Sequence, residues 1–153
     1  GFAVGAGSTL VMLSDMAVAE DDAKFIYPEA KIGAFAGIMA GFPPRIQYKA
    51  GLEWLMTGDP MTAQRAYEVG LVNRVVPKGQ ALAAAMELAA KVAANAPLVV
   101  QAMKSIARGT LPPSPTALYY PQRRMLDGIA NSDDIKEGVA SFKDKRPPRF
   151  TGR

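Results

Sequence analysis

Two segments near the start of the chain contain residues that could take part in a reaction. The first runs from Gly1 to Gly7, GFAVGAG, and precedes an expected helix. Its glycines would let a ligand approach the backbone closely, and the free N–H groups and dipole at a helix start favour an anion. The segment lacks the Lys-Ser/Thr of a P-loop and the full G-x-G-x-x-G spacing. On its own it is more typical of a structural turn than of a binding site.

The second segment is Pro28-Glu29. Glu29 is the only carboxylate between Asp22 and Glu53, and it lies between two glycine-rich apolar stretches. A carboxylate in such surroundings would have a raised pKa and could exchange protons near neutral pH. On these residues alone, a solvent-facing Glu after a proline is the more common explanation.

The composition restricts which chemistry is available. The 153 residues include no His and no Cys. This excludes a Ser-His-Asp triad, a His general base and thiol chemistry from this chain alone, and we predict no metal site. Acid–base work falls to carboxylates, Lys or Tyr. We expect no signal peptide, no membrane span and a cytoplasmic location, because the apolar start lacks a basic region and no apolar run reaches about 18 residues.

Basic residues are concentrated at the end of the chain. The net charge is +4, and residues 141–153 hold five Lys or Arg against one Asp. Such a segment can contact nucleic acid, acidic lipid or a phosphate-bearing ligand, or it can be a solvated, partly disordered terminus. The chain lacks the alternation of aromatic and basic residues that stacking on RNA requires, so we do not expect a nucleic-acid partner.

Residue patterns along the chain predict the elements that must position these groups. The first half reads as mixed strand and helix, and the second half as helical. We expect a short helix, capped by Ser8 or Thr9, to run to about Leu13. The expected strands are 16–19, 23–27 and 71–76. The other expected helices are 46–56, 62–69 with Thr62 as N-cap, 80–94, 97–108, 116–129 and 133–142.

Four segments of the chain resemble the enoyl-CoA hydratase/isomerase (crotonase) superfamily, in the family's order: GFAVGAG-x-x-L-x-x-x-x-D, AKFIYPEAKIG, LMTGDPMTAQRAYEVGLVNRVVP and EGVASFKDKRPPRFTGR. The resemblance implies an α/β fold. Residues 1–79 would be part of a crotonase-like ββα spiral, and residues 80–153 a helical region with a basic tail that assembles trimers or hexamers. It also implies the carboxy-terminal portion of such a protein, without the upstream part that supplies another oxyanion donor and much of the coenzyme A pocket.

The resemblance further implies a reaction and two catalytic groups. An acyl-CoA thioester would react through an enolate, and coenzyme A would enter with the substrate rather than as a separate cofactor. In the triplet Gly5-Ala6-Gly7, the backbone N–H of Ala6 would hold the thioester oxygen, an interaction worth about 3 kcal/mol. Glu29 would move the proton.

Three more residues take roles by resemblance. Thr9 stands where hydratases have a second catalytic Glu, so the chain retains one carboxylate. One base suffices to move a double bond, whereas hydration uses two carboxylates well, so isomerisation is at least as plausible as hydration. Phe35 would line the acyl pocket, and Lys145 would lie near the coenzyme's phosphates. A catalytically silent, truncated oligomerisation module and an RNA-binding member of the family are the alternative functions.

Overall fold

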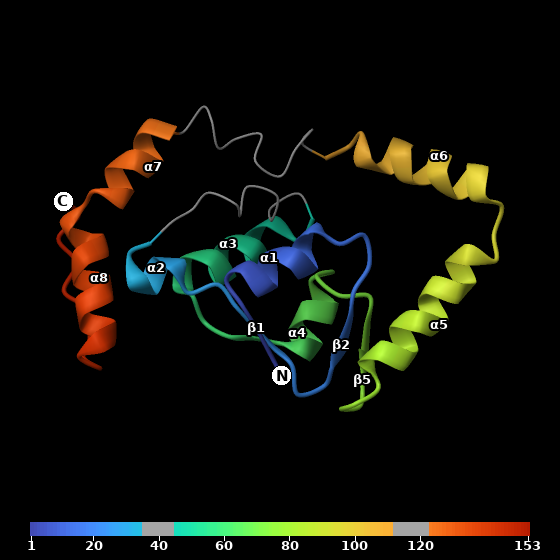
Figure 1. Ribbon diagram of the computed structural model, residues 1–153, viewed down its shortest axis with the longest axis horizontal. Helices are drawn as coiled ribbons and strands as arrows, with labels where there is room; N and C mark the ends of the chain where they lie inside the picture. The colour runs from blue at the N-terminus through green and yellow to red at the C-terminus, as the bar shows by residue number, and fades with distance from the viewer. Residues whose placement is uncertain (35–44, 112–122) are drawn as a thin grey trace.

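The computed structural model describes residues 1–34, 45–111 and 123–153. In these ranges short strands and helices alternate up to residue 76, and only helices follow (Figure 1). Phe35 lies outside the described residues. The elements are β1 Phe2–Val4, α1 Ala6–Leu13, β2 Val18–Glu20, β3 Lys24–Ile26, α2 Glu29–Ile32, α3 Tyr48–Thr57, β4 Met61–Thr62, α4 Ala63–Glu68, β5 Arg74–Val76, α5 Ala81–Ala93, α6 Pro97–Arg108, α7 Arg123–Ala130 and α8 Asp133–Lys143.

The strands form two small sheets. Strands β1, β3 and β4 make up one sheet, and β2 and β5 make up the other. Strand β1 pairs in parallel with β3, and β2 pairs in parallel with β5. Strand β4 adds to β3 in the antiparallel direction. Because parallel strands end at the same edge of a sheet, the residues that follow β1 and β3 are brought side by side. This edge carries Gly5, Ala6 and Glu29.

Helix α1 begins earlier than the sequence predicts. Its N-cap is Gly5, with φ 50° and ψ −108°, and not Ser8 or Thr9. The hydroxyl of Ser8 donates to the carbonyls of Ala3 at 2.7 Å and Ile26 at 3.1 Å, which belong to the two paired strands β1 and β3. The hydroxyl of Thr9 donates to the carbonyl of Gly5 at 3.2 Å. Neither hydroxyl is free to cap the helix, and Ser8 instead ties its first turn to both strands.

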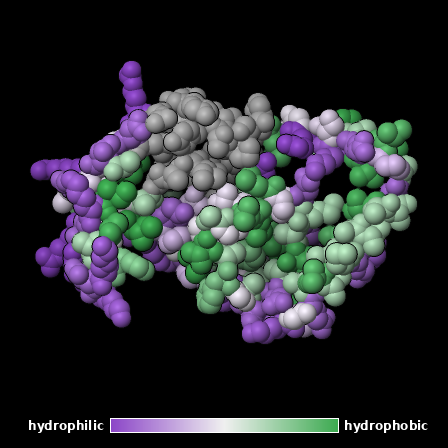
Figure 2. Space-filling model, viewed as in Figure 1, coloured by the Kyte–Doolittle hydropathy of each residue, from purple (hydrophilic) through white to green (hydrophobic). Residues whose placement is uncertain are grey.

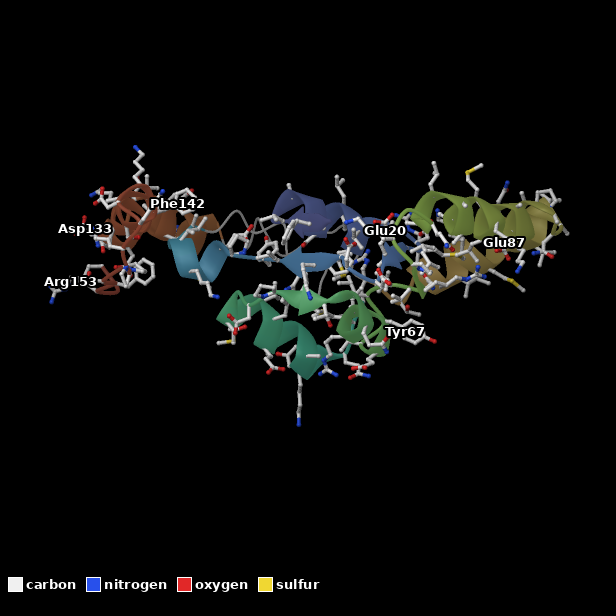
Figure 3. The ribbon with its side chains drawn as sticks, turned by 90° about the horizontal axis from the view of Figure 1, so that it is seen from below. Glu20, Tyr67, Glu87, Asp133, Phe142 and Arg153 are labelled. Carbon is white, nitrogen blue, oxygen red and sulfur yellow. The ribbon has the colours of Figure 1, made fainter. Side chains whose placement is uncertain are left out.

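The hydrophobic core lies in the first half of the chain. The buried apolar side chains of the described residues fall between Met12 and Val72. Figure 3 shows the strands between α1 on one side and α3 and α4 on the other. Trp54 of α3 is 4% exposed, and its indole N–H donates to the carbonyl of Phe25 at 3.2 Å, which fixes α3 against β3.

Helices α5 and α6 extend from one end of this core. Helix α5 contacts β2 and β5, and Lys104 of α6 forms an ion pair with Asp15. Neither helix buries a residue, and Figure 2 shows hydrophobic residues gathered over this part of the surface. Among the described residues no single helix is long and apolar enough to cross a membrane. Together α5 and α6 meet that test by length and composition, but they are bent by 108°.

Helix α8 packs at the other end of the core, against α2. The approach is very close, because a Cβ atom added to Gly138 would overlap the carbonyl oxygen of Ile32. The turn after α2 is equally tight: a Cβ on Gly33 would lie 2.7 Å from the carbonyl oxygen of Asp134 and 3.2 Å from the Phe150 ring. Backbone contact between the two helices therefore fixes where α8 and the residues after it lie.

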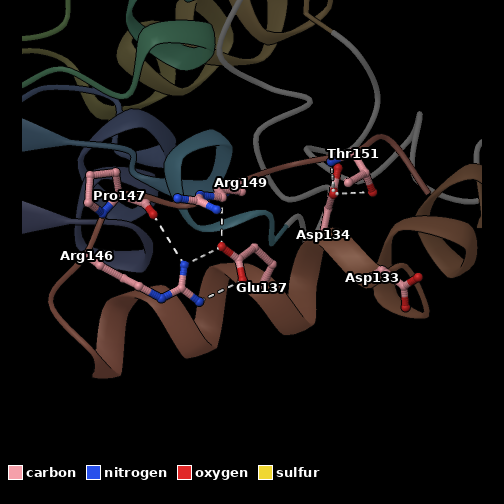
Figure 4. A pocket seen from close by; sticks show the side chains of 7 residues that line it. All are labelled: Asp133, Asp134, Glu137, Arg146, Pro147, Arg149 and Thr151. Atoms are coloured by element: carbon pink, nitrogen blue, oxygen red, sulfur yellow. Dashed lines mark hydrogen bonds and ion pairs between the residues drawn. The ribbon is translucent and has the colours of Figure 1, made fainter.

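The basic tail folds back along α8 instead of extending into solvent, so its description as a partly disordered terminus is wrong (Figure 4). The Arg146 guanidinium binds both carboxylate oxygens of Glu137, at 2.6 and 2.8 Å, and the Arg149 N–H donates to the same carboxylate at 2.8 Å. One carboxylate oxygen of Asp134 accepts from the N–H of Thr151 at 2.6 Å and the other from the N–H of Gly152 at 2.9 Å. Two acids of α8 therefore hold the tail.

We expect the part of the tail around Arg146 and Arg149 to loosen when Glu137 loses its charge. The Arg146 guanidinium and the Arg149 N–H lower the pKa of Glu137 to about 2. Because the folded pKa lies below the ordinary Glu value of about 4.3, the stabilisation is complete above that value and is lost as the pH falls through about 2. Glu137→Gln should speed amide exchange at Arg149 at neutral pH, as followed by NMR. Asp133→Asn, which removes only the exposed pair with Lys136, is the control and should leave the Arg149 amide protected.

Candidate functional site

The ends of β1 and β3 bring Gly5 and Glu29 into contact. In the parallel pair, Val4 lies opposite Ile26, and the N–H of Gly5 donates to the carbonyl of Ile26 at 2.8 Å. Glu29 follows three residues later as the first residue of α2. A Cβ atom on Gly5 would lie 3.2 Å from the Oε1 atom of Glu29, so the carboxylate rests directly over this glycine.

Next to this carboxylate is the start of α1, where free N–H groups gather. The first backbone bond of α1 joins the N–H of Thr9 to the carbonyl of Gly5 at 3.0 Å. The three preceding residues, Ala6, Gly7 and Ser8, therefore have no carbonyl acceptor within the helix. Ala6 is an exposed residue, and an N–H at this position of a helix favours an oxygen atom that carries negative charge.

Glu29 has the environment of a group that transfers protons. The side chain is half-buried, and its Oε2 atom is buried with no hydrogen-bond partner among the described residues. Burial raises the pKa of Glu29 above its ordinary value, because the charged form loses hydration, and this effect exceeds the opposite effect of a hydrogen bond from its own backbone N–H. The carboxylate therefore binds a proton more readily than an exposed Glu does.

Thr9 and Tyr27 lie beneath Gly5 and Glu29, and both are almost fully buried. The Thr9 hydroxyl, in contact with the Gly5 carbonyl, also forms a hydrogen bond with Tyr27. Burial and the nearby Glu29 charge raise the pKa of Tyr27 to about 12, against the opposite effect of the Thr9 bond. Neither Tyr27 nor the anchoring role of Ser8 was predicted from the sequence. A Tyr directly before Pro-Glu is the signal that could have identified Tyr27, which follows the end of β3.

Glu29 also lines a cavity of about 630 Å³ that could receive an acyl group. The other walls come from α3, α7 and the tail, and they include Leu52, Leu55, Met56, Met125, Ile129 and Gly152. The walls are mostly apolar, and Tyr27 contributes to them as well. The arrangement places a carboxylate with a raised pKa at the wall of an apolar cavity, beside free backbone donors.

The remaining predicted site residues are placed differently. Gly7 lies in the first turn of α1, one residue beyond Ala6. Lys145 is exposed after the end of α8, with the unusual backbone angle φ 53°, and it is not among the residues that line the cavity. Its backbone closes the helix, since the N–H of Lys145 donates to Phe142 and that of Arg146 to Ser141. The structure thus brings Gly5, Ala6, Thr9 and Glu29 together and leaves Lys145 outside the cavity wall.

A model of the family described as enoyl-CoA hydratase/isomerase matches residues 1–153. The chain belongs to this family. Its structure resembles that of a carnitinyl-CoA hydratase from Mycobacterium avium, with a TM-score of 0.89, 38% identity and coverage of 100% of this chain and 60% of the other. The crotonase fold implied by the sequence is thereby confirmed for the part of it that this chain forms.

Two enzymes illustrate the family at the level of sequence. The 2,3-dehydroadipyl-CoA hydratase of Escherichia coli is 35% identical over 157 residues, with coverage of 100% of this chain and 61% of the enzyme. The carnitinyl-CoA dehydratase of Proteus mirabilis is 36% identical over 165 residues, with the same coverage. The chain therefore spans about 61% of the length of these relatives.

Proposed function

We propose that this family member acts on an acyl-CoA thioester through an enolate, with Glu29 as its single acid–base group. The observation that supports the proposal is the contact between the Glu29 carboxylate and Gly5, one residue from the N–H of the exposed Ala6. The proposed proton-transfer group and the proposed oxyanion donor thus lie at the same edge of the sheet. Coenzyme A enters as part of the substrate, and no separate cofactor takes part.

The proposed reaction uses each of these groups once. The thioester oxygen accepts a hydrogen bond from the Ala6 N–H, and the bond strengthens as an enolate forms. Glu29 accepts a proton from the acyl carbon chain and returns it to the same or a neighbouring position. The Thr9 hydroxyl already donates to Gly5, so it does not replace the second carboxylate of a hydratase. We therefore expect isomerisation to be at least as favourable as hydration.

Two features bear on the substrate. Several relatives carry names of hydratases or dehydratases acting on dehydroadipyl-CoA and carnitinyl-CoA, so a short functionalised acyl chain is the first class to assay. Lys145 is proposed to contact the phosphates of coenzyme A, because it is exposed whereas the neighbouring Arg146 is bound to Glu137. Turnover of a panel of 2-enoyl and 3-enoyl thioesters tests the proposal, with Glu29→Gln as the decisive variant.

The alternative function, an oligomerisation module, is favoured by the apolar surface of α5 and α6. Leu82 is 77% exposed, Leu98 78% and Ile106 76%. Apolar residues of this size are rarely exposed together on a monomer, and covering them is worth about 25 cal/mol per Å². We propose that this surface joins copies of the chain into a trimer or hexamer, which is compatible with catalysis.

We expect Ile106→Lys to dissociate the assembly, since a charge at this interface loses its hydration without gaining a partner. Analytical ultracentrifugation at roughly 10 μM, a range in which specific interfaces hold, should show an oligomer for the wild type and a smaller species for the variant. The control Gln101→Lys adds a charge to the same helix at an exposed polar position and should remain associated. A wild-type monomer at this concentration would contradict the interface.

A further inference from the structure

The orientation of the Ala6 N–H depends on a single peptide group. The described residues contain no cis peptide bond, so the peptide between Gly5 and Ala6 is trans and planar. Its carbonyl and its N–H therefore point in opposite directions. Gly5 has φ 50° and ψ −108°, a conformation open to glycine, and a glycine at this place lets the peptide rotate. Whatever holds the Gly5 carbonyl also decides where the Ala6 N–H points.

Thr9 holds this carbonyl twice. Its backbone N–H donates to the Gly5 oxygen at 3.0 Å, and its hydroxyl donates to the same oxygen at 3.2 Å. The side chain is 6% exposed, so water does not compete for these bonds. A backbone bond of this kind occurs in every helix, whereas the hydroxyl bond is an addition that this residue type supplies.

Tyr27 completes the chain of hydrogen bonds. The Thr9 hydroxyl therefore lies between the Gly5 carbonyl, to which it donates, and the Tyr27 hydroxyl, with which it shares a hydrogen bond. Tyr27 keeps its proton at neutral pH, since its pKa is raised to about 12. Its ring packs edge-on against Trp54, with the centroids 6.3 Å apart, and this contact restricts its movement.

We propose that Thr9 and Tyr27 are positioning residues that clamp the Gly5–Ala6 peptide, so that the Ala6 N–H stays aimed at the thioester oxygen. The inference rests on the proposed function and assigns a role to the position where hydratases have a second carboxylate. Thr9 acts on the oxyanion donor instead of on water. Tyr27 acts on the Gly5 carbonyl through Thr9, and Thr9 is not among the residues that line the cavity.

Variants of the full-length protein that remove one hydroxyl at a time test this clamp. Thr9→Val should lower kcat about 10²-fold with KM little changed, because an oxyanion donor acts mainly in the transition state. Tyr27→Phe keeps the ring and should lower kcat about tenfold. Affinity for the nitronate analogue of propionyl-CoA, which carries its charge where the enolate does, should fall by the same factors, while affinity for propionyl-CoA should not change.

Two comparisons separate positioning from ordinary stability. The double variant should be no slower than Thr9→Val alone, since Tyr27 works only through Thr9. Thr9→Ser restores the hydroxyl and should recover most of kcat. Thr57→Val is the matched control, because the Thr57 hydroxyl makes the same kind of bond, to the carbonyl of Glu53 at 2.8 Å, in a helix away from Gly5.

The clamp is overturned if Thr9→Val keeps wild-type kcat and nitronate affinity, or if it lowers only the melting temperature as Thr57→Val does. Additive losses in the double variant would also overturn it, because they would mean that the two residues act separately. Failure of the proposed function looks different: Glu29→Gln would then turn over every active thioester at the wild-type rate.

Discussion

Glu29→Gln should reduce turnover by about 10²-fold or more while leaving thioester affinity largely intact. The amide has nearly the shape of the carboxylate but cannot accept a proton, and general-base catalysis contributes about 10²–10⁴. In the wild type, the rate should fall with decreasing pH in a range above that of an ordinary Glu, because burial raises the pKa of Glu29 and protonation removes the base. Kinetics of both proteins across the pH range test the two statements together.

The same substitution should make the protein more stable near neutral pH. A raised folded pKa means that the folded state binds the proton more tightly than the unfolded state, so ionisation of Glu29 lowers the free energy of unfolding as the pH rises. Glu29→Gln removes this effect. At pH 7 the variant should therefore have a higher melting temperature than the wild type. Glu53→Gln, at an exposed position of α3, is the control and should change neither rate nor melting temperature. Wild-type turnover by Glu29→Gln would show that the reaction uses a different base.

Gly5→Ala should abolish activity nearly completely, because two effects coincide at this residue. The backbone has φ 50° and ψ −108°, which a residue with a side chain adopts only at a cost of about 1–3 kcal/mol. The added Cβ would lie 3.2 Å from the Oε1 atom of Glu29. The chain can relieve this only by turning the Gly5–Ala6 peptide or by displacing the carboxylate. Either change separates the oxyanion donor from the base, so we expect kcat to fall by at least about 10².

Gly70→Ala separates backbone strain from the effect at the site. Gly70 has φ 81°, so an added side chain is strained there as well, but no other atom lies within 4 Å of the new Cβ. We therefore expect both variants to lose stability in chemical denaturation, and Gly5→Ala alone to lose turnover. Equal loss of turnover in the two would mean that Gly5 matters only for folding.

The sequence predicted the local structure best where one side chain decides it. Thr62 is the N-cap of α4, with its hydroxyl accepting from the N–H of Arg65 at 3.1 Å, and Gly70 follows the helix with a positive φ, both as expected. Helix α6 begins at Pro97 and ends at Arg108, as its residues indicate. Caps and helix-starting prolines are local signals, so they can be interpreted without knowing what the helix packs against.

Predictions failed where the deciding contact comes from a distant segment. Ser8 looks like a helix cap in the sequence, but its hydroxyl is taken by the carbonyl of Ile26, which only strand pairing brings near. The basic tail looked partly disordered because its partner, Glu137, precedes Arg146 by nine residues across the end of a helix. The role of Glu29 followed from resemblance, whereas its contact with Gly5 required the parallel register of β1 and β3.

The cavity beside Glu29 is assembled from segments far apart in the chain. Its reactive wall comes from the residues that follow β3, whereas α3, α7 and the tail form the facing walls. Substitutions in α7 can therefore reshape the cavity without moving Glu29, the proposed proton-transfer residue. For the evolution of such enzymes, this separation means that a lineage can inherit one reaction and acquire a new acyl preference by exchanging distal segments. It also makes Met125 and Ile129 the positions to randomise when the enzyme is engineered for another thioester.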